Sequence, residues 1–462
     1  MGNSKAERDE PLTPAGRLFL RPDFHQIIHI IMGFKNPIDT DAVKSEITNS
    51  VMIKLPRFSS LIVRNSSGGE HWRKTQVDVD HHVIVIEDPV SDASAGDEEA
   101  VNDYVADLSV SSPLSSDKPL WEVHLLTAHN CMVFRIHHAL ADGISLMSML
   151  QECCRRADRP NDQRLSTTGS VINSSLNKKN RMRELWKLVV GLFMNVVFIM
   201  EIMLRAFWVK DRRTVVSGGA GVELWPRKLA TAKFRFDDMK QVKKAVADAT
   251  INDVLSGIIS SGLSRYLDMR SPKALRDGVQ ITGLTMVNLR KQPGLQELSK
   301  MIRGNSGIRW GNKFGTVLFP VYYRQGGGDP LQHVKTAKKM MDQKKHSLEA
   351  HFSYYFGMCC FGPKLSSWLS YRTVCNTTFT ISNVVGLKEE ITIAGNPVTY
   401  MRMNMTSIPH AISMHMLSYG GRADLQILVA KDIVPDPEVL AKCFEDALLQ
   451  MKEAAAPKEF GK

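Results

Sequence analysis

Two kinds of hydrophobic pattern alternate along the first part of the chain. The runs at 77–88 and 131–136 are rich in Val and Ile and predict strands. In the segment 143–156, apolar residues recur every three or four positions, which predicts an amphipathic helix. Strand and helix patterns in alternation are typical of α/β proteins.

The same alternation returns after about residue 227. Helical spacing marks 250–267 and 436–454, whereas 279–289 and 377–385 have the composition of strands. No repeat of fixed period is visible, which argues against solenoids and propellers. The pattern therefore predicts two similar α/β halves in one chain.

A polar segment at 156–180 interrupts the pattern and predicts a surface linker. The chain has 462 residues, and single cores stop growing at about 250–300 residues, so two subdomains are expected. We predict an N-terminal subdomain at 1–165, a connecting region at 166–226 and a C-terminal subdomain at 227–462.

The connecting region contains an apolar stretch at 188–209, whose 22 residues are enough to span a bilayer. Its thirteen Leu, Ile, Val and Phe residues favour insertion by roughly 4–8 kcal/mol, while Glu201 and Arg205 each oppose it by about 2.5–3.5 kcal/mol. The sum is near zero. Two alternatives stay open: a membrane-associated helix, either inserted or lying in the interface, and a buried core helix.

The net charge of +11 favours an anionic partner. Basic residues flank both ends of the apolar stretch, at 178–187 and 210–213, which favours contact with anionic lipid headgroups. No zinc-finger or RNA-binding motif is present, so we expect no nucleic-acid partner.

The chain has seven cysteines, and no two of them have CxxC spacing. Two pairs, Cys153–Cys154 and Cys359–Cys360, are adjacent in sequence, which gives poor disulfide geometry. Free thiols are typical of a reducing compartment, so we expect the protein to face the cytosol.

The stretch RIHHALADGIS at 135–145 carries the strongest candidate chemistry. It places two adjacent histidines, His137 and His138, where a predicted strand ends. A metal site is disfavoured, because no further ligands stand nearby at zinc-like spacing. A purely structural role stays open, because a second pair, His81–His82, looks inert: Ile86 stands where the acid should be, and no glycine follows it.

The alternative is that the pair supplies a general base, because a neutral imidazole suits proton transfer near pH 7. Neighbouring residues on an extended backbone point to opposite sides, so only one of the two histidines should face a substrate. We expect Asp142 to orient the turn by pairing with an arginine. Gly143 permits a positive φ or the close approach of another backbone. The candidate arginines are Arg290, Arg57 and Arg17.

Residues 137–143 match the HHxxxDG signature of the CoA-dependent acyltransferase superfamily, and the chain resembles the plant form of the wax ester synthase/diacylglycerol acyltransferase family. The resemblance covers about residues 10–455 and rests on motifs in the family's order. These motifs are PLTPAGRLF, LPRFSS, DKPLWEVHLL, HHALADG, TINDVL, MVNLR, GNKFG and TISNVVGL. One position departs from the family: Leu387 stands where proline is common, a change expected to affect a loop near the acyl channel.

This resemblance implies an α/β fold of two chloramphenicol-acetyltransferase-like subdomains, with mixed sheets and a tunnel between them. It also implies that His138 is the general base that deprotonates the acceptor hydroxyl. His137 then shapes the site, and Asp142 and Gly143 hold the loop rather than relay protons.

The reaction that the resemblance implies is direct transfer of a long-chain acyl group from acyl-CoA to a long-chain alcohol, and also to diacylglycerol. Acyl-CoA is a co-substrate, and no cofactor or metal is expected. The tetrahedral oxyanion needs hydrogen-bond donors. Asn383 is the candidate donor, with Ser382 beside it at the substrate site, although a turn-stabilising role for Asn383 is the alternative. We expect the protein at the endoplasmic reticulum membrane, or at the cell membrane, with its catalytic part facing the cytosol.

Two other functions stay open. Soluble plant acyltransferases of small alcohols or amines usually carry one HxxxD histidine and a DFGWG motif, and DFGWG is absent here. A non-catalytic lipid-binding relative would keep the tunnel without turnover, which the intact HHxxxDG disfavours.

Overall fold

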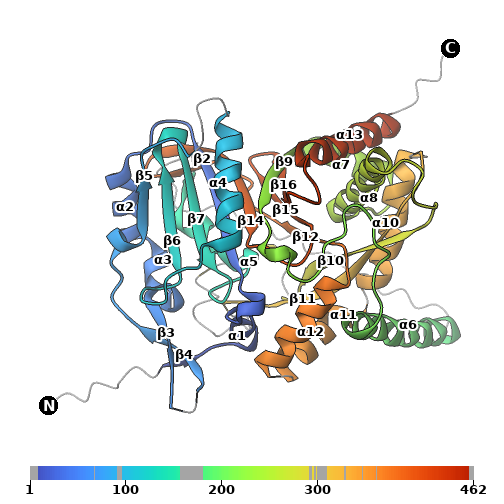
Figure 1. Cartoon of the computed structure of the whole chain (residues 1–462), viewed down its shortest axis with the longest axis horizontal. Coiled ribbons are helices and arrows are strands. Elements are labelled where there is room, and N and C mark those ends of the chain that lie inside the picture. Colours follow the sequence, from blue (N-terminus) through green and yellow to red (C-terminus); the bar gives the residue numbers. More distant parts are fainter. Residues whose placement is uncertain are drawn as a thin grey trace.

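The computed structural model describes residues 9–456, apart from 67, 91–95, 157–180, 291–293, 296–297, 299–309, 327–328, 346 and 361. The linker predicted at 156–180 lies almost wholly outside these residues. The described chain folds into two large sheets that stand side by side, each with helices packed on it (Figure 1). The predicted α/β class is therefore confirmed.

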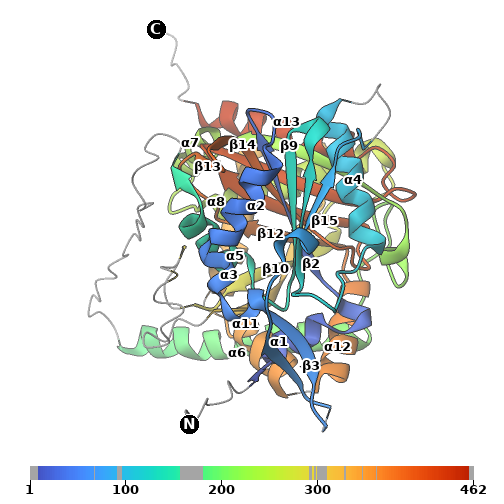
Figure 2. The same cartoon turned by 90° about the vertical axis from the view of Figure 1, so that its left-hand side faces the viewer.

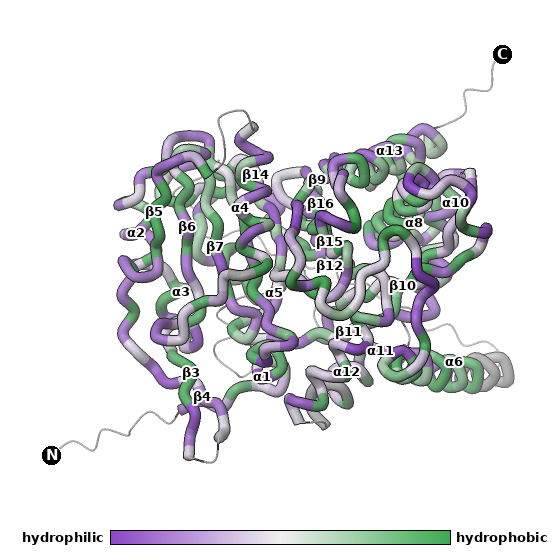
Figure 3. The backbone as a smooth tube through the Cα atoms, in the orientation of Figure 1, coloured by the Kyte–Doolittle hydropathy of each residue, from purple (hydrophilic) through white to green (hydrophobic). Residues whose placement is uncertain are grey.

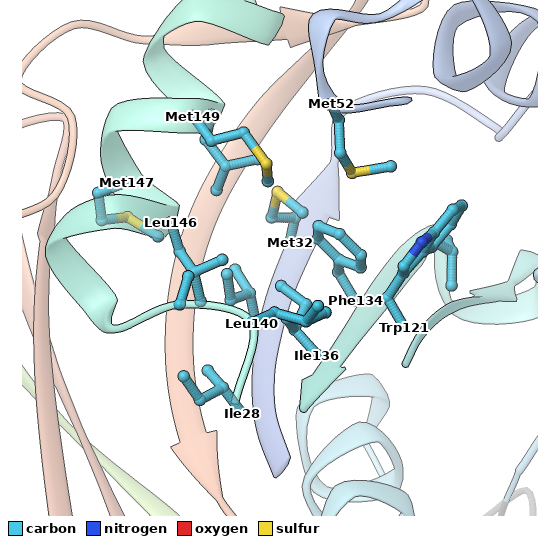
Figure 4. Close-up of a cluster of buried hydrophobic side chains, with 14 of the residues drawn as sticks. Ile28, Met32, Met52, Trp121, Phe134, Ile136, Leu140, Leu146, Met147 and Met149 are labelled. Carbon is cyan, nitrogen blue, oxygen red and sulfur yellow. The ribbon is translucent and has the colours of Figure 1, made fainter. Parts of the chain in front are cut away.

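The first sheet has seven strands in the order β5-β6-β7-β2-β14-β13-β8. They are β2 (Ile27–Phe34), β5 (Val83–Ile86), β6 (Trp121–Leu126), β7 (Cys131–His137), β8 (Arg155–Arg156), β13 (Ile391–Ile393) and β14 (Asn396–Met405). Helices α2 (Thr40–Asn49), α3 (Val51–Lys54) and α5 (Gly143–Cys153) pack on one face, and α4 (Asp97–Ser111) packs on the other. Figure 4 shows Leu146 and Met149 of α5 packed against Met32, Phe134 and Ile136 of the sheet.

Two strands of this sheet come from the C-terminal half of the chain. β14 pairs antiparallel with β2, and Met401 lies opposite Met32. All eight residues of β2 are buried, so without β14 this strand would present a buried, unpaired edge. The predicted boundaries are incomplete for this reason, because residues 391–405 leave the C-terminal half and complete the first sheet.

The second sheet has six strands in the order β11-β10-β12-β15-β16-β9. They are β9 (Arg227–Arg235), β10 (Gln280–Asn288), β11 (Phe314–Tyr322), β12 (Phe379–Val384), β15 (Ile412–Tyr419) and β16 (Arg422–Ala430). Its outer face packs on α7 (Phe236–Ala245), α8 (Ile251–Arg270), α10 (Pro330–Lys345) and α13 (Pro437–Ala455). Parallel and antiparallel pairs both occur, so the prediction of mixed sheets is confirmed.

The inner face of the second sheet meets a further group of helices. They are α1 (Pro14–Phe19), α6 (Arg181–Phe207), α11 (Glu349–Phe352), the π-helix η6 (Ser353–Cys360) and α12 (Pro363–Cys375). α1, α6, α11 and α12 gather at the lower end of the molecule (Figure 2). This end lies next to the point where the two sheets come together.

Helix α6 contains the apolar stretch predicted at 188–209. Within the described chain, Val189–Phe207 is long and apolar enough to cross a membrane by length and composition. Figure 3 shows α6 as a largely hydrophobic helix that projects from the lower side. Phe193 is 65% exposed and Leu192 is 63% exposed, so the alternative of a buried core helix is wrong.

Candidate active site

The HHxxxDG loop connects β7 to α5 and is held from both halves of the chain. The backbone N–H of His138 donates to the carbonyl oxygen of Gln26 at 2.8 Å. From the C-terminal half, Nδ2 of Asn312 donates to the carbonyl oxygen of His138 at 2.7 Å, and Nε1 of Trp310 donates to that of Leu140 at 2.9 Å. These bonds fix the loop at the junction of the two sheets.

The two adjacent histidines point in different directions, as the strand geometry predicts. His138 lines a cavity of about 240 Å³, whereas His137 does not. The Nδ1 atom of His137 accepts the backbone N–H of Ala139 at 3.1 Å, and its ring lies edge-on to His25 with centroids 4.7 Å apart. His137 is therefore placed to shape the turn, and His138 is the histidine that faces the cavity.

The side chain of Asn312 determines which nitrogen of His138 carries the proton. Because Nδ2 of Asn312 donates to a carbonyl, its other atom, Oδ1, must face Nδ1 of His138, at 2.9 Å. An amide oxygen only accepts, so Nδ1 of His138 carries the hydrogen. The lone pair then lies on Nε2, which makes that nitrogen the basic one. The sequence contained Asn312 within GNKFG, but nothing in the motif itself assigned it this role.

Aromatic rings enclose the imidazole of His138. The ring of Phe19 stacks on it with centroids 4.2 Å apart, and Phe314 lies at 5.6 Å. Burial lowers the pKa of His138 below its usual range, and the charge of Asp142 opposes that shift. The imidazole is consequently neutral near pH 7, which is the state a general base needs.

Asp142 is a structural anchor with every acceptor position in use. Its Oδ1 accepts the N–H of Ser145 as the N-cap of α5 at 3.0 Å, and its Oδ2 accepts the N–H of Lys313 at 2.9 Å. Arg290 forms a bidentate pair with it, with N–O distances of 2.7 and 3.0 Å. The side chain of Arg57 bonds to Glu10 instead.

Arg290 is thus the arginine that pairs with Asp142. Its Nη2 also donates to the carbonyl oxygen of Gly311, one residue before Asn312. The Asp142–Arg290 pair therefore joins the HHxxxDG loop to the segment that carries the partner of His138.

Gly143 begins α5 with a negative φ, so the predicted alternative of a positive φ is wrong. The alternative of a close approach fits better, although a side chain approaches and not a backbone. A Cβ on Gly143 would lie 3.0 Å from Cγ2 of Val384, which is tighter than ordinary van der Waals contact. Glycine here lets β12 approach the start of α5.

The cavity floor is the inner face of the second sheet. Alternate residues of β12 and β15 line it, because side chains alternate between the faces of a strand. These are Thr380, Ser382, Val384, Ser413 and His415. Apolar side chains of α1, α6, β10, η6 and α12 complete the wall, among them Leu18, Ile202, Leu284, Phe356 and Leu369.

The two neighbours Ser382 and Asn383 differ in what their side chains do. Both residues line the cavity, and Ser382 lies opposite His415 in the parallel pairing of β12 with β15. Nδ2 of Asn383 donates to Oδ1 of Asn252 at 2.5 Å, which is the stabilising role given above as the alternative. Strand alternation therefore favours Ser382 over Asn383 as a group that contacts substrate.

Two polar residues of the cavity floor were missed by the sequence reasoning. Ser413 and His415 are 2% and 3% exposed, and Oγ of Ser413 and Nδ1 of His415 have no hydrogen-bond partner in the described structure. Burial, with the nearby ring of His138, lowers the pKa of His415 to about 4. Their alternation in β15 was visible in the sequence, but only the strand pairing brings them beside Ser382.

Two other singled-out positions lie away from the cavity. Leu387 is buried in the core of the first sheet and does not itself line the cavity, so its effect on the loop near the acyl channel stays a prediction. His82 stacks on Trp121 with centroids 3.8 Å apart, and burial lowers its pKa to about 4. Its role is structural, as the comparison of the two histidine pairs indicated.

Within the described residues, no group of three His, Cys, Asp or Glu side chains is placed to hold a metal ion.

Comparisons with known proteins place this site in a family. Residues 40–255 match the wax ester synthase/diacylglycerol acyltransferase catalytic domain, and 310–452 match the WS/DGAT C-terminal domain. Wax ester synthase/diacylglycerol acyltransferase 11 of Arabidopsis thaliana is 35% identical, with 96% of this chain and 95% of the relative covered. Number 5 from the same plant is 33% identical, with 96% and 94% covered.

Two solved structures share the fold. The wax ester synthase/diacylglycerol acyltransferase from Marinobacter aquaeolei VT8 has a TM-score of 0.59 at 16% identity, covering 96% of this chain and 99% of its own. The first condensation domain of the calcium-dependent antibiotic synthetase has a TM-score of 0.60 at 14% identity, covering 98% and 97%. The fold, the near-complete match to plant relatives and the two family domains agree. The chain therefore belongs to the wax ester synthase/diacylglycerol acyltransferase family of acyltransferases.

Proposed function

We propose that the protein transfers a long-chain acyl group from acyl-CoA to the hydroxyl of a long-chain alcohol and so makes a wax ester. The observation that carries this proposal is the pairing of His138 with Asn312 at the edge of an apolar cavity. The pairing leaves Nε2 of a neutral imidazole free to take a proton. The apolar walls suit an acyl chain, and His138 is the base that the motif implies.

The reaction follows from these groups. Nε2 of His138 removes the proton of the acceptor hydroxyl while the oxygen attacks the thioester carbonyl. A tetrahedral intermediate forms, and its oxyanion accepts a hydrogen bond from the hydroxyl of Ser382. The C–S bond then breaks, the carbonyl re-forms, and the CoA thiolate takes the proton from the imidazolium. Asp142 takes no part in proton transfer, because Arg290, Lys313 and Ser145 occupy both of its oxygens.

Diacylglycerol is a second acceptor that a specific observation favours. A diacylglycerol brings two ester carbonyls into the cavity, whereas a fatty alcohol brings none. Such buried carbonyls need hydrogen-bond donors. The unpartnered hydroxyl of Ser413 and the unpartnered Nδ1 of His415 are buried in the cavity floor and are placed to supply them.

We further propose that the protein works at the endoplasmic reticulum membrane, with its catalytic part facing the cytosol. The lipid substrates and the apolar, exposed helix α6 support a membrane location. Each cysteine whose side chain the structure describes has a free thiol, which supports a reducing compartment. Fractionation of cells that express a tagged protein tests this location, and a protein found wholly in the soluble fraction would contradict it.

The decisive test is a turnover assay with radiolabelled palmitoyl-CoA and hexadecanol, dioleoylglycerol or a small alcohol as acceptor. We expect wax ester from hexadecanol and none in the His138→Ala variant. His81→Ala, which alters an exposed histidine, is the matched control and should keep full activity. Turnover with the small alcohol alone would favour the soluble acyltransferase alternative. No turnover with any acceptor would favour a lipid-binding relative.

A further inference from the structure

Helix α6 carries an exposed apolar stripe along its outer side. The residues recur at intervals of four or three, so they share one face of the helix. They are Val189 (52% exposed), Phe193 (65%), Val196 (54%), Met200 (50%) and Leu204 (36%). We call these five residues the outer stripe. An exposed apolar surface of this length on one element indicates an interaction site.

The opposite face of α6 is bound to the protein through its polar groups. Oδ1 of Asn195 accepts the N–H of Leu348, and Nζ of Lys344 lies 4.3 Å from the ring centroid of Phe198. Arg205 is buried, and it bonds to Asp211 and Thr282 at 2.8 Å each. Phe198 follows Asn195 by three residues and Arg205 follows Phe198 by seven, or about two turns, which places all three on one face opposite the outer stripe.

These inner contacts argue against a helix that crosses the membrane. A spanning α6 would have to leave the body of the protein, and Arg205 would lose its buried partners. Breaking a buried ion pair by removing one partner costs about 3–5 kcal/mol. A helix that lies in the plane of the interface keeps all of these bonds and still buries the outer stripe in lipid.

The surface around the outer stripe has the residue composition of protein surfaces that contact a membrane interface. Trp208 is 74% exposed at the end of α6, and Trp368 and Leu365 of α12 are each 45% exposed. Tryptophan favours the boundary between headgroups and acyl chains. Exposed basic residues stand near these apolar groups, namely Lys210, Arg212, Arg213 and Lys364. Their charge is complementary to anionic headgroups.

The same helix forms part of the catalytic cavity. Ile202, Met203 and Ala206 of α6 line the cavity that contains His138. Of the described lining residues, only Phe356 of η6 is exposed, and η6 follows α11, which packs against α6. The exposed Phe356 therefore places part of the cavity wall at the surface, close to the helix that carries the outer stripe.

We infer that α6 lies in the plane of an anionic membrane with the outer stripe in the lipid, and that lipid acceptors enter the cavity from the bilayer past Phe356. The docking surface stands on its own observations, whereas the acceptor route rests on the proposed function. In this arrangement a long-chain alcohol reaches His138 without passing through water.

Vesicle co-sedimentation of the full-length protein tests the docking surface. The probes are phosphatidylcholine vesicles with and without phosphatidylserine, at low and high salt. We expect binding that is stronger with phosphatidylserine and weaker at high salt. The variant with Phe193→Gln and Met200→Gln should lose about tenfold or more in binding, because two apolar side chains no longer transfer into lipid. A variant with Leu449→Gln and Met269→Gln, equally exposed on α13 and α8, is the matched control and should bind like the wild type.

Three outcomes would overturn the docking inference. Equal vesicle binding by the stripe variant and the control would show that the outer stripe does not dock. Retention in cell membranes after carbonate extraction at high pH would show a spanning helix. A stable dimer of the wild type, dissociated by the stripe variant, would show that a second copy covers the stripe.

Activity assays test the acceptor route separately. The stripe variant should lose turnover of vesicle-embedded hexadecanol but keep turnover of a water-soluble alcohol, because the outer stripe does not line the cavity. Equal loss with both acceptors would contradict the route. If the wild type turns over neither acceptor, the proposed function fails, and the vesicle-binding result still decides the docking surface.

Discussion

Oδ1 of Asn312 lies 2.9 Å from Nδ1 of His138, although 174 positions separate the two residues in the sequence. One amide from the C-terminal half thus sets the tautomer of His138, the proposed base in the N-terminal half. The arrangement is complete only when the two halves of the chain are docked, and the buried pair Asp142–Arg290 is one of the contacts that join them.

Replacing Asn312 tests this relationship. In Asn312→Ala, Nδ1 loses its acceptor, so both tautomers are populated and the ring rotates more freely. We expect kcat to fall at least about tenfold while KM for acyl-CoA changes little, since general-base catalysis contributes about 10²- to 10⁴-fold. In Asn312→Asp the acceptor is retained, so part of the activity should return. Steady-state kinetics of the two variants measure the difference, and equal kcat values in wild type and Asn312→Ala would contradict the role.

The pH dependence of the rate follows from the direction of the His138 shift. The base acts when neutral, and burial lowers its pKa, so kcat/KM should stay level from pH 8 to below the ordinary histidine pKa of about 6.5. In Asn312→Asp the new carboxylate favours the imidazolium, which raises the pKa. The acidic limb of that variant should therefore move to higher pH. Rate profiles of both proteins check this, and a limb that stays in place would rule out His138 as the titrating base.

The Asp142–Arg290 pair makes a prediction about stability. Arg290→Leu leaves the carboxylate of Asp142 buried at 7% exposure without its cation. Breaking a buried ion pair in this way costs about 3–5 kcal/mol in the free energy of unfolding. The control Lys240→Leu removes the exposed pair with Asp237 and should cost about 1 kcal/mol or less. Urea unfolding measures both, and similar values for the two variants would show that the buried pair does not hold the halves together.

Several parts of this arrangement were predictable from the sequence, and others depend on distant pairing. The HHxxxDG loop, the different directions of His137 and His138 and the helix after Asp142 all follow from local strand and helix geometry. Asn312 and His415 were not assigned, because each acquires its role from a neighbour far away in the chain. The placement of residues 391–405 in the first sheet also could not be read locally, since a strand pattern does not name its partner.

Buried neutral histidines make the fold sensitive to acid. Burial lowers the pKa of His410 to about 3 and that of His415 to about 4. Below pH 6.5 the unfolded chain binds protons at these residues and the folded protein does not, so the free energy of unfolding falls as the pH falls. Each group contributes up to about 1.4 kcal/mol per pH unit, and because the unfolded histidines are only partly protonated at pH 6, the two together contribute roughly 2.4 kcal/mol between pH 6 and 5.

Urea titrations at pH 7, 6 and 5 measure this slope. His410→Gln removes one titrating group while its amide can still bond to Thr377 and Thr380, and it should make the slope shallower. A slope unchanged in that variant would mean that His410 does not titrate on unfolding.

The cavity floor separates the two acceptors. Ser413→Ala removes a buried hydroxyl that has no protein partner, so folding should be unaffected. If that hydroxyl donates to an ester carbonyl of diacylglycerol, its loss removes one hydrogen bond, which lowers kcat/KM for diacylglycerol by about three- to tenfold. The value for hexadecanol should stay unchanged, because a fatty alcohol has no such carbonyl.

Ser382→Ala is the control. It removes the proposed donor to the oxyanion, which both reactions share, so the turnover of both acceptors should fall equally. A competition assay with the two acceptors measures the ratio directly. A Ser413→Ala variant that keeps the wild-type ratio would show that the polar floor does not recognise the glycerol esters.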